Sequence, residues 1–123
     1  MPLGFNSLNL RRFKRIKLKY CDGTCSIKDL VLCDNFFTRS RGMLFQRKED
    51  HRKAFLLTKC NAIHTFFMAY PIDIIFLSKE GEILSQLRVE TYSTASVKNA
   101  YAVIEGTKLL KSNNSVCDVE FLC

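Results

Sequence analysis

The sequence predicts a single α+β domain, mainly of antiparallel strands in a small barrel-like or half-open sheet, with one or two short helices. Length and composition support one domain, since 123 residues with 47% hydrophobic and 25% charged side chains are ordinary for one globular unit and too few for two. The apolar runs are short, several alternate with polar residues, and turn residues bound them. We expect residues 1–11 to form a flexible tail and residues 12–123 to form the domain.

The elements are expected in the following order. Residues 15–20 and 26–32 predict a hairpin that turns at Asp22-Gly23, and Asp34 and Gly42 are favourable limits for a short helix over residues 35–41. Further strands are expected at residues 53–58, 72–77, 82–89, 101–104 and 116–122. Residues 46–53 and 91–98 are expected as loops, and residues 107–111 as a helical turn.

Two of these strands have distinct patterns. Residues 72–77 are apolar on both faces apart from Asp73, which predicts a central strand covered on both sides. In residues 82–89, Ile83, Leu87 and Val89 are expected to share one face of the strand.

The net charge of +7 is concentrated near the N-terminus, where residues 11–19 hold six of the 19 basic residues and no acidic one. Ile16, Leu18 and Tyr20 alternate with the basic residues, which predicts a strand with one solvated basic face. Lysines on such a face would also suit the edge of a sheet. Nucleic-acid binding through residues 11–19 is an alternative, but no second basic cluster with stacking aromatics supports it.

The N-terminal residues lack the order of a signal peptide, in which positive charges precede the apolar stretch. We therefore expect a cytoplasmic protein, or an exported one if the true start lies upstream. No apolar run approaches the roughly 18 residues of a membrane span.

The six cysteines show no C-x-x-C spacing, so a structural zinc site has little support. Cys117 and Cys123 alternate with Val119 and Phe121 and are expected to be buried. Cys21 and Cys25 flank the first turn and could face each other; in a reducing cytosol they would remain thiols.

One segment resembles a known family. It reads Cys60-Asn-Ala-Ile-His64-Thr-Phe-Phe-Met68-Ala-Tyr-Pro71-Ile-Asp73-Ile-Ile-Phe76 and continues to Gly81, and Arg39-Ser-Arg-Gly42-Met-Leu44 precedes it. These motifs, in this order, closely resemble the domain-of-unknown-function 192 family of bacteria and archaea. The His-Thr-Phe-x-Met form resembles one of its subgroups, although Phe67 stands where many members have Trp. The resemblance covers roughly residues 15 to 106 and implies a compact, strand-rich fold without an established reaction.

Cys60, His64 and Met68 are spaced four apart and would point the same way on a helix or a strand. Their side chains are soft ligands that suit copper. On a straight strand they would span about 13 Å, too far for one ion. A metal site, or an enzymatic pocket with Cys60 as nucleophile and His64 as base, is therefore an alternative, and no cofactor is predicted.

Asp73 lies in an apolar strand, where a buried carboxylate needs partners. Arg39 and Arg41 beside the Gly42 turn are candidates, and loop N–H groups are others. We expect a structural anchor. The alternative is a ligand site of His64, Asp73, Arg39, Arg41 and Tyr70.

The sequence contains no phosphate loop, zinc spacing, paired-carboxylate motif or nucleophile elbow. We therefore predict a small, non-enzymatic binding or accessory domain for an unknown small ligand or protein. Polar groups converging on His64 would favour an enzyme or a metal site, and an apolar environment would favour the binding domain.

Overall fold

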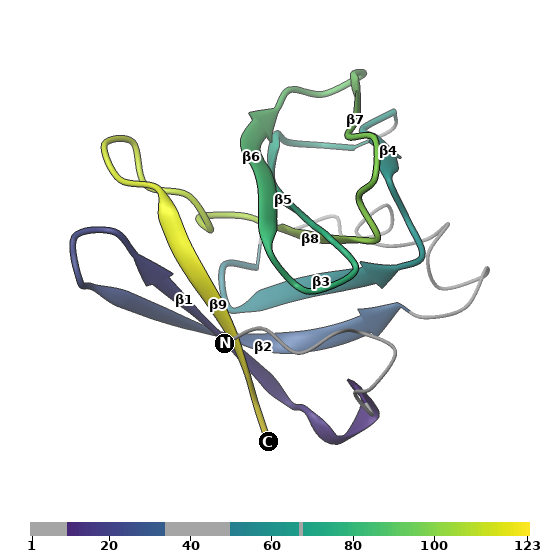
Figure 1. Ribbon diagram of the computed structural model, residues 1–123. Helices are drawn as coiled ribbons and strands as arrows, with labels where there is room; N and C mark the ends of the chain where they lie inside the picture. Colours follow the sequence, from purple (N-terminus) through teal and green to yellow (C-terminus); the bar gives the residue numbers. More distant parts are fainter. Residues whose placement is uncertain (1–9, 34–49, 67) are drawn as a thin grey trace.

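The computed structural model describes residues 10–33, 50–66 and 68–123, which form a curled seven-stranded sheet and a separate two-stranded sheet (Figure 1). After a 3-10 turn, η2 (Leu10–Arg12), the strands are β1 (Arg15–Tyr20), β2 (Cys25–Cys33), β3 (Lys53–Thr58), β4 (Ala62–His64), β5 (Ile72–Leu77), β6 (Ile83–Val89), β7 (Thr94–Ser96), β8 (Ala102–Gly106) and β9 (Val116–Leu122). The large sheet has the order β6-β5-β8-β3-β2-β1-β9, and β4 pairs with β7. Within the described ranges, no helix is long and apolar enough to cross a membrane.

Strand pairing is antiparallel throughout, apart from the parallel pair β2–β3. The predicted hairpin of β1 and β2 is confirmed, with Lys19 opposite Cys25. Strand β1 lies between β2 and β9, so the expectation of an edge strand is wrong. The edges of the large sheet are β6 and β9.

The protein is mostly β. The part of the α+β prediction that expected one or two short helices is wrong. In the part of the chain that the structure describes, η2 is the only helical element. The helix expected over residues 35–41 lies outside the described residues. Residues 107–111 form no helical turn, because the backbone N–H groups of Leu109 and Leu110 both donate to Asp73.

The expected loop over residues 91–98 contains a strand, β7, which pairs with β4. Neither strand was predicted. Each has three residues, with only the central one turned inward, so neither shows a period-two apolar pattern.

Two hydrophobic cores lie on opposite faces of the large sheet. The inner core, inside the curl, contains Ile16, Leu18, Leu56, Ile75, Leu77, Ile104 and Leu109. The outer core, beneath the small sheet, contains Phe55, Leu57, Ile63, Met68, Ile72, Ile74 and Phe76. All of β5 is buried, which confirms the predicted central strand.

A β-bulge in β6 changes which side chains face inward. Leu77 pairs with Ile83, but the preceding Phe76 pairs with Ser85. The extra residue shifts the alternation by one, so Ile83 packs in the inner core while Val89 packs in the outer core. The expectation that Ile83, Leu87 and Val89 share a face is therefore wrong.

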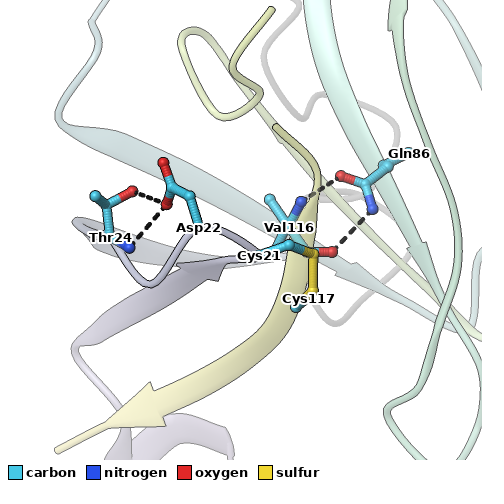
Figure 2. The surroundings of a disulfide bond; sticks show 6 residues. All are labelled: Cys21, Asp22, Thr24, Gln86, Val116 and Cys117. Atoms are coloured by element: carbon cyan, nitrogen blue, oxygen red, sulfur yellow. Dashed lines mark hydrogen bonds between the residues drawn. A yellow bond between two sulfur atoms is a disulfide. The ribbon is translucent and has the colours of Figure 1, made fainter. Parts of the chain in front are cut away.

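A side chain joins the two edges of the curled sheet. The amide of Gln86 on β6 donates to the carbonyl of Val116 at 2.9 Å and accepts from the N–H of Val116, on β9, at 2.8 Å (Figure 2). We call this contact between β6 and β9 the seam. The sheet thus closes through one glutamine rather than through a continuous strand ladder.

Candidate functional site

The carboxylate of Asp73 is only 1% exposed, at the start of β5. Arg88 lies opposite on β6, and its Nε donates to Oδ1 at 2.8 Å. The backbone N–H groups of Leu109 and Leu110 both donate to Oδ2 at 3.0 Å. The hydroxyl of Tyr20 donates to the carbonyl of Leu109 at 2.6 Å, so this loop is held from both sides.

The expected contact of Asp73 with loop N–H groups is therefore present, and the paired cation within the described residues is Arg88. Arg39 and Arg41 lie outside the described residues. Because both carboxylate oxygens of Asp73 have donors within the fold, Asp73 acts here as an anchor for the loop after β8.

Cys60, His64 and Met68 do not face one open surface. His64 is exposed at the end of β4, whereas Met68 is 7% exposed and packs in the outer core with Tyr70. The half-buried thiol of Cys60 donates to the carbonyl of Ala62 at 3.1 Å. A turn at Thr65, whose carbonyl accepts the N–H of Met68 at 3.1 Å, separates Met68 from the end of β4. The predicted common orientation is therefore wrong.

No group of three or more His, Cys, Asp or Glu side chains among the described residues is placed to hold a metal ion. Methionine is not among these side chains, so copper bound by Cys60, His64 and Met68 stays a prediction. Tyr70 also stays a predicted ligand residue, although it is only 7% exposed.

The ring of His64 stacks on the ring of Phe66, with centroids 5.1 Å apart and an interplanar angle of 28°. Phe66 is 39% exposed, and nearby Tyr92 is 68% exposed. We call His64, Phe66 and Tyr92 the aromatic surface. The surroundings of His64 are thus aromatic and open, which favours the binding class.

Buried Thr65 holds the aromatic surface in place. Its hydroxyl donates to the carbonyl of Glu90 at 2.5 Å and accepts from the N–H of Ser93 at 2.8 Å. Its carbonyl accepts the N–H of Tyr92 at 3.1 Å. Tyr92 has a φ of 57°, in the left-handed region that a bulky residue rarely adopts.

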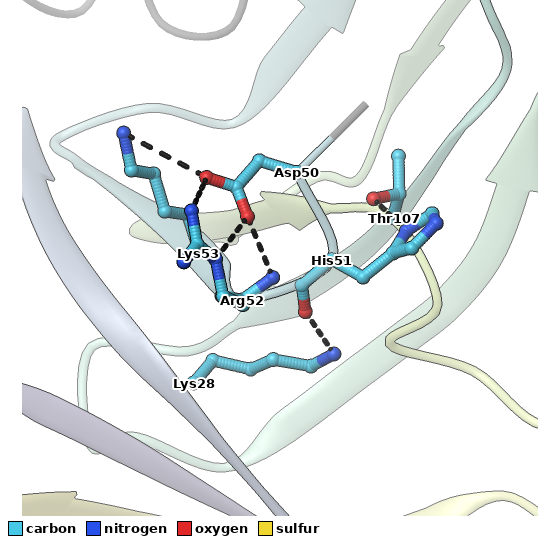
Figure 3. A network of polar contacts seen from close by, with 6 residues as sticks. All are labelled: Lys28, Asp50, His51, Arg52, Lys53 and Thr107. Carbon is cyan, nitrogen blue, oxygen red and sulfur yellow. Dashed lines mark hydrogen bonds and ion pairs between the residues drawn. The ribbon is translucent and has the colours of Figure 1, made fainter. Parts of the chain in front are cut away.

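A second polar site was missed in the sequence. Lys28 on β2 is 7% exposed, whereas its neighbour Ile27 is 52% exposed, the reverse of the usual burial. The ammonium group of Lys28 donates to the carbonyl of His51, and His51 Nδ1 lies 2.8 Å from Thr107 Oγ1 (Figure 3). With Lys108, which follows Thr107, these residues form what we call the lysine cluster.

Burial lowers the pKa of Lys28, and repulsion from Lys108 lowers it further, while attraction from Asp73 and Asp50 acts in the opposite direction. The available sequence signal was the position of Lys28 in the same alternating row as Leu30 and Leu32, which pack on the inner core.

The basic segment forms the predicted strand over residues 15–20, and acidic residues lie beside it. Lys19 Nζ lies 3.2 Å from Glu120 Oε2 and 4.0 Å from Asp118 Oδ2, both on β9. Lys17 pairs in register with Glu120, and Arg15 pairs with Asp29 on β2. Residues that are distant in the sequence thus offset the charge of this strand.

A disulfide joins Cys21, after β1, to Cys117 on β9, with the two Cα atoms 5.2 Å apart (Figure 2). The suggested partnership of Cys21 with Cys25 is therefore wrong. The expected burial of Cys117 and Cys123 is also wrong, because both are exposed. Tyr20 pairs with Val116 and Lys19 pairs with Asp118, so Cys117 is an extra residue on β9 that breaks the alternation with Val119 and Phe121.

The fold and these surfaces define a small half-barrel β-domain with an exposed aromatic surface. Two solved structures share this fold. A putative transcription regulator from Sinorhizobium meliloti has a TM-score of 0.70 at 15% identity, over 87% of this chain and 92% of that one. A protein of unknown function from Novosphingobium aromaticivorans has a TM-score of 0.69 at 14% identity, over 86% and 83%.

The chain belongs to the domain-of-unknown-function 192 family (DUF192), whose model, described as "Uncharacterized ACR", matches residues 21–114. Two UPF0127 proteins are similar to it. That of Thermococcus sibiricus is 35% identical over 50% of this chain and 42% of its own length. That of Thermococcus kodakarensis is 32% identical over 61% and 51%. The matched segments thus span about half the length of these relatives, and the family resemblance of the sequence is confirmed.

Proposed function

We propose that this chain is a non-enzymatic binding domain that holds a protein partner at the aromatic surface of His64, Phe66 and Tyr92. The observation that carries the proposal is Tyr92, which is 68% exposed and has a φ of 57°. A bulky side chain in the left-handed region costs roughly 1 kcal/mol or more, and Gly would avoid that strain. Because the Tyr92 ring is mostly exposed, it contributes little to the core in return.

Three features of the aromatic surface favour a protein partner. Aromatic side chains are enriched in protein interfaces and dominate their binding energy. The stacked pair of His64 and Phe66 offers flat, partly apolar area, and exposed Tyr92 adds a hydroxyl that can hydrogen-bond at an interface. Thr65 holds the surface through its bonds to Glu90 and Ser93, so little conformational entropy is lost on binding.

The other function classes have weaker support. Within the described ranges the His64 ring stacks on the ring of Phe66, whereas a general base needs polar partners that orient it. One structural neighbour is titled a putative transcription regulator, but the acidic residues beside β1 reduce the field that would attract nucleic acid.

The test is site-specific photo-crosslinking in the source organism. A photoreactive side chain replaces Tyr92, and in a matched control it replaces Ile27, an exposed apolar residue on β2. We expect one discrete protein adduct from position 92 and none of the same mass from position 27. Phe66→Ala, introduced together with the photoreactive residue, should remove the adduct while leaving the melting temperature within a few degrees.

The same adduct from both positions, an adduct that survives Phe66→Ala, or no adduct from position 92 would overturn the proposal. Tyr92→Gly provides a check on strain. It should keep the fold at unchanged or slightly higher stability, yet lose the partner in a binding assay with the protein identified by crosslinking.

A further inference from the structure

The ammonium group of Lys28 has more hydrogen-bond donors than the described part of the fold satisfies. Lys28 is 7% exposed, and in the described part of the chain its ammonium group makes one hydrogen bond, to the carbonyl of His51. A lysine ammonium carries three N–H donors, so two are left over. Burying a charged group without partners is unfavourable, and a buried charge is normally paired.

Among the described residues, the two carboxylates that attract Lys28, Asp73 and Asp50, already have other partners. Asp73 is bonded by Arg88 and by two backbone N–H groups. Asp50 accepts from the side chain of Arg52 at 3.1 Å and lies 3.9 Å from the ammonium group of Lys53. Lys108 adds another positive charge close enough to repel Lys28. The lysine cluster therefore has an excess of positive charge.

The loop that carries Lys108 has a fixed path. A Cβ on Gly106 would lie 3.0 Å from the side chain of Leu109, which fills the inner core, so the chain must turn tightly after β8. Lys108 follows with a φ of 53°, and the N–H of Leu109 is held by Asp73. The charge of Lys108 is thus presented from a strained but well-bonded turn, as is common where a structure is preorganised for binding.

We propose that Lys28 anchors a binding site for a small oxyanion, the oxygens of a carboxylate or phosphate group, in the lysine cluster of Lys28, His51, Thr107 and Lys108. The two remaining N–H donors of Lys28 bond to the anion, and Lys108 attracts it from the exposed side. The bound anion supplies the missing counter-charge. The lysine cluster and the aromatic surface of His64, Phe66 and Tyr92 share no residue, so the two proposals are independent.

The inverted burial of β2 supports this assignment. Were the fold alone to decide, an apolar residue would occupy the inward position of Lys28, and Ile27 would not be 52% exposed. Departures from such local rules are expected at functional sites.

The test is an NMR titration of the folded protein at constant ionic strength, with inorganic phosphate in one arm, acetate in a second and chloride in a third. We expect saturable shifts of the Lys28 Cε–Hε signals and of the Lys28 and Lys108 amides with phosphate, acetate or both. The relative affinities identify the anion class. Chloride should produce no saturable shift.

Two pairs of variants make the test specific. Lys28→Met should abolish the saturable shifts, whereas Lys17→Met, at a half-buried lysine on β1, should leave them unchanged. Lys108→Asn should weaken binding several-fold, and Lys59→Asn should not, although both lysines are exposed and have φ near 54°, which Asn tolerates. The Lys108 pair keeps the test valid even if Lys28→Met fails to fold.

Thermal unfolding gives a second readout. Wild type should melt at a higher temperature as the bound anion is added, because a ligand of the native state stabilises it. Lys28→Met should lose that dependence. Shifts that persist in Lys28→Met, equal losses in Lys108→Asn and Lys59→Asn, or no saturable response to either oxyanion would overturn the proposal.

Discussion

At the scale of single residues, Asp73 shows how one buried carboxylate can fix a distant loop. Its oxygens accept one bond from Arg88 at 2.8 Å and two from the N–H groups of Leu109 and Leu110 at 3.0 Å. Each partner offsets part of the cost of removing the charge from water. The side chain of Leu109 can therefore stay in the inner core without a helix to hold its backbone.

Replacing Asp73 with Ala should lower the free energy of unfolding by about 2–4 kcal/mol, because it removes the acceptor of two backbone N–H groups and one hydrogen-bond partner of Arg88. Asp73→Asn keeps the shape and some of the bonds and should cost less. Urea unfolding measures both. Asp118→Ala serves as control, since its contact with Lys19 is long and half-exposed and should contribute less than about 1 kcal/mol.

An unchanged stability of Asp73→Ala would contradict the anchor role. Asp73 would then be the first residue to test as a ligand contact, alongside His64 and Tyr70.

At the scale of elements, the seam decides whether the large sheet stays curled. Strands β6 and β9 meet through the two hydrogen bonds of Gln86 to Val116, next to the disulfide of Cys21 and Cys117. The bulge in β6 turns Gln86 inward, and the disulfide ties β9 to the end of β1. The Gln86 contact and the disulfide hold β9, which pairs with one strand, β1.

Gln86→Ala should cost about 1–3 kcal/mol, because it leaves the N–H and the carbonyl of Val116 without partners in a partly buried position. Hydrogen exchange of the Val116 amide should become markedly faster, and urea unfolding reports the change in stability. Ser85→Ala, next in the chain and turned to the other face, is the matched control. Unchanged protection of Val116 would show that Gln86 does not close the seam.

Cys117→Ser should lower stability by about 2–5 kcal/mol under oxidising conditions, since the disulfide closes a loop with a sequence separation of 96. Urea unfolding with and without a reductant measures this. Wild type should lose the same amount on reduction, whereas Cys117→Ser should not respond. Equal stability of oxidised and reduced wild type would exclude a stabilising bond between Cys21 and Cys117.

At the scale of the whole molecule, the charge distribution matters more than the net charge of +7. Lys19 lies against two acidic side chains of β9, and Arg15 and Lys17 pair in register with Asp29 and Glu120. A sheet that places acidic side chains beside basic ones has a weaker field than the linear sequence indicates.

We therefore expect random DNA and RNA to bind no more tightly than the non-specific range of about 10⁻⁴ to 10⁻⁶ M at physiological salt. A fluorescence-anisotropy titration over several salt concentrations tests this. The double variant Lys17→Glu plus Lys19→Glu should bind about as weakly as wild type. Tight binding that falls steeply with salt, and that this double variant loses, would instead support the nucleic-acid function of residues 11–19.

Some features were accessible from the sequence because they depend on local patterns. Period-two alternation located β1, and the apolar run Ile72–Leu77 predicted a central strand. The lone carboxylate of Asp73 required partners wherever the strand lay. The ordered motifs indicated the family, which the match over residues 21–114 confirms.

Tertiary structure alone decided which side chains meet. Arg88 reaches Asp73 only because β5 and β6 pair in one register, and Cys117 reaches Cys21 only because β9 returns beside β1. Strand order and register depend on the packing of both faces of the sheet at once, and local alternation carries no information about that. For the same reason the sequence showed that Lys28 alternates with Leu30 and Leu32. It did not show that Lys28 is buried, or that its ammonium group makes one hydrogen bond among the described residues.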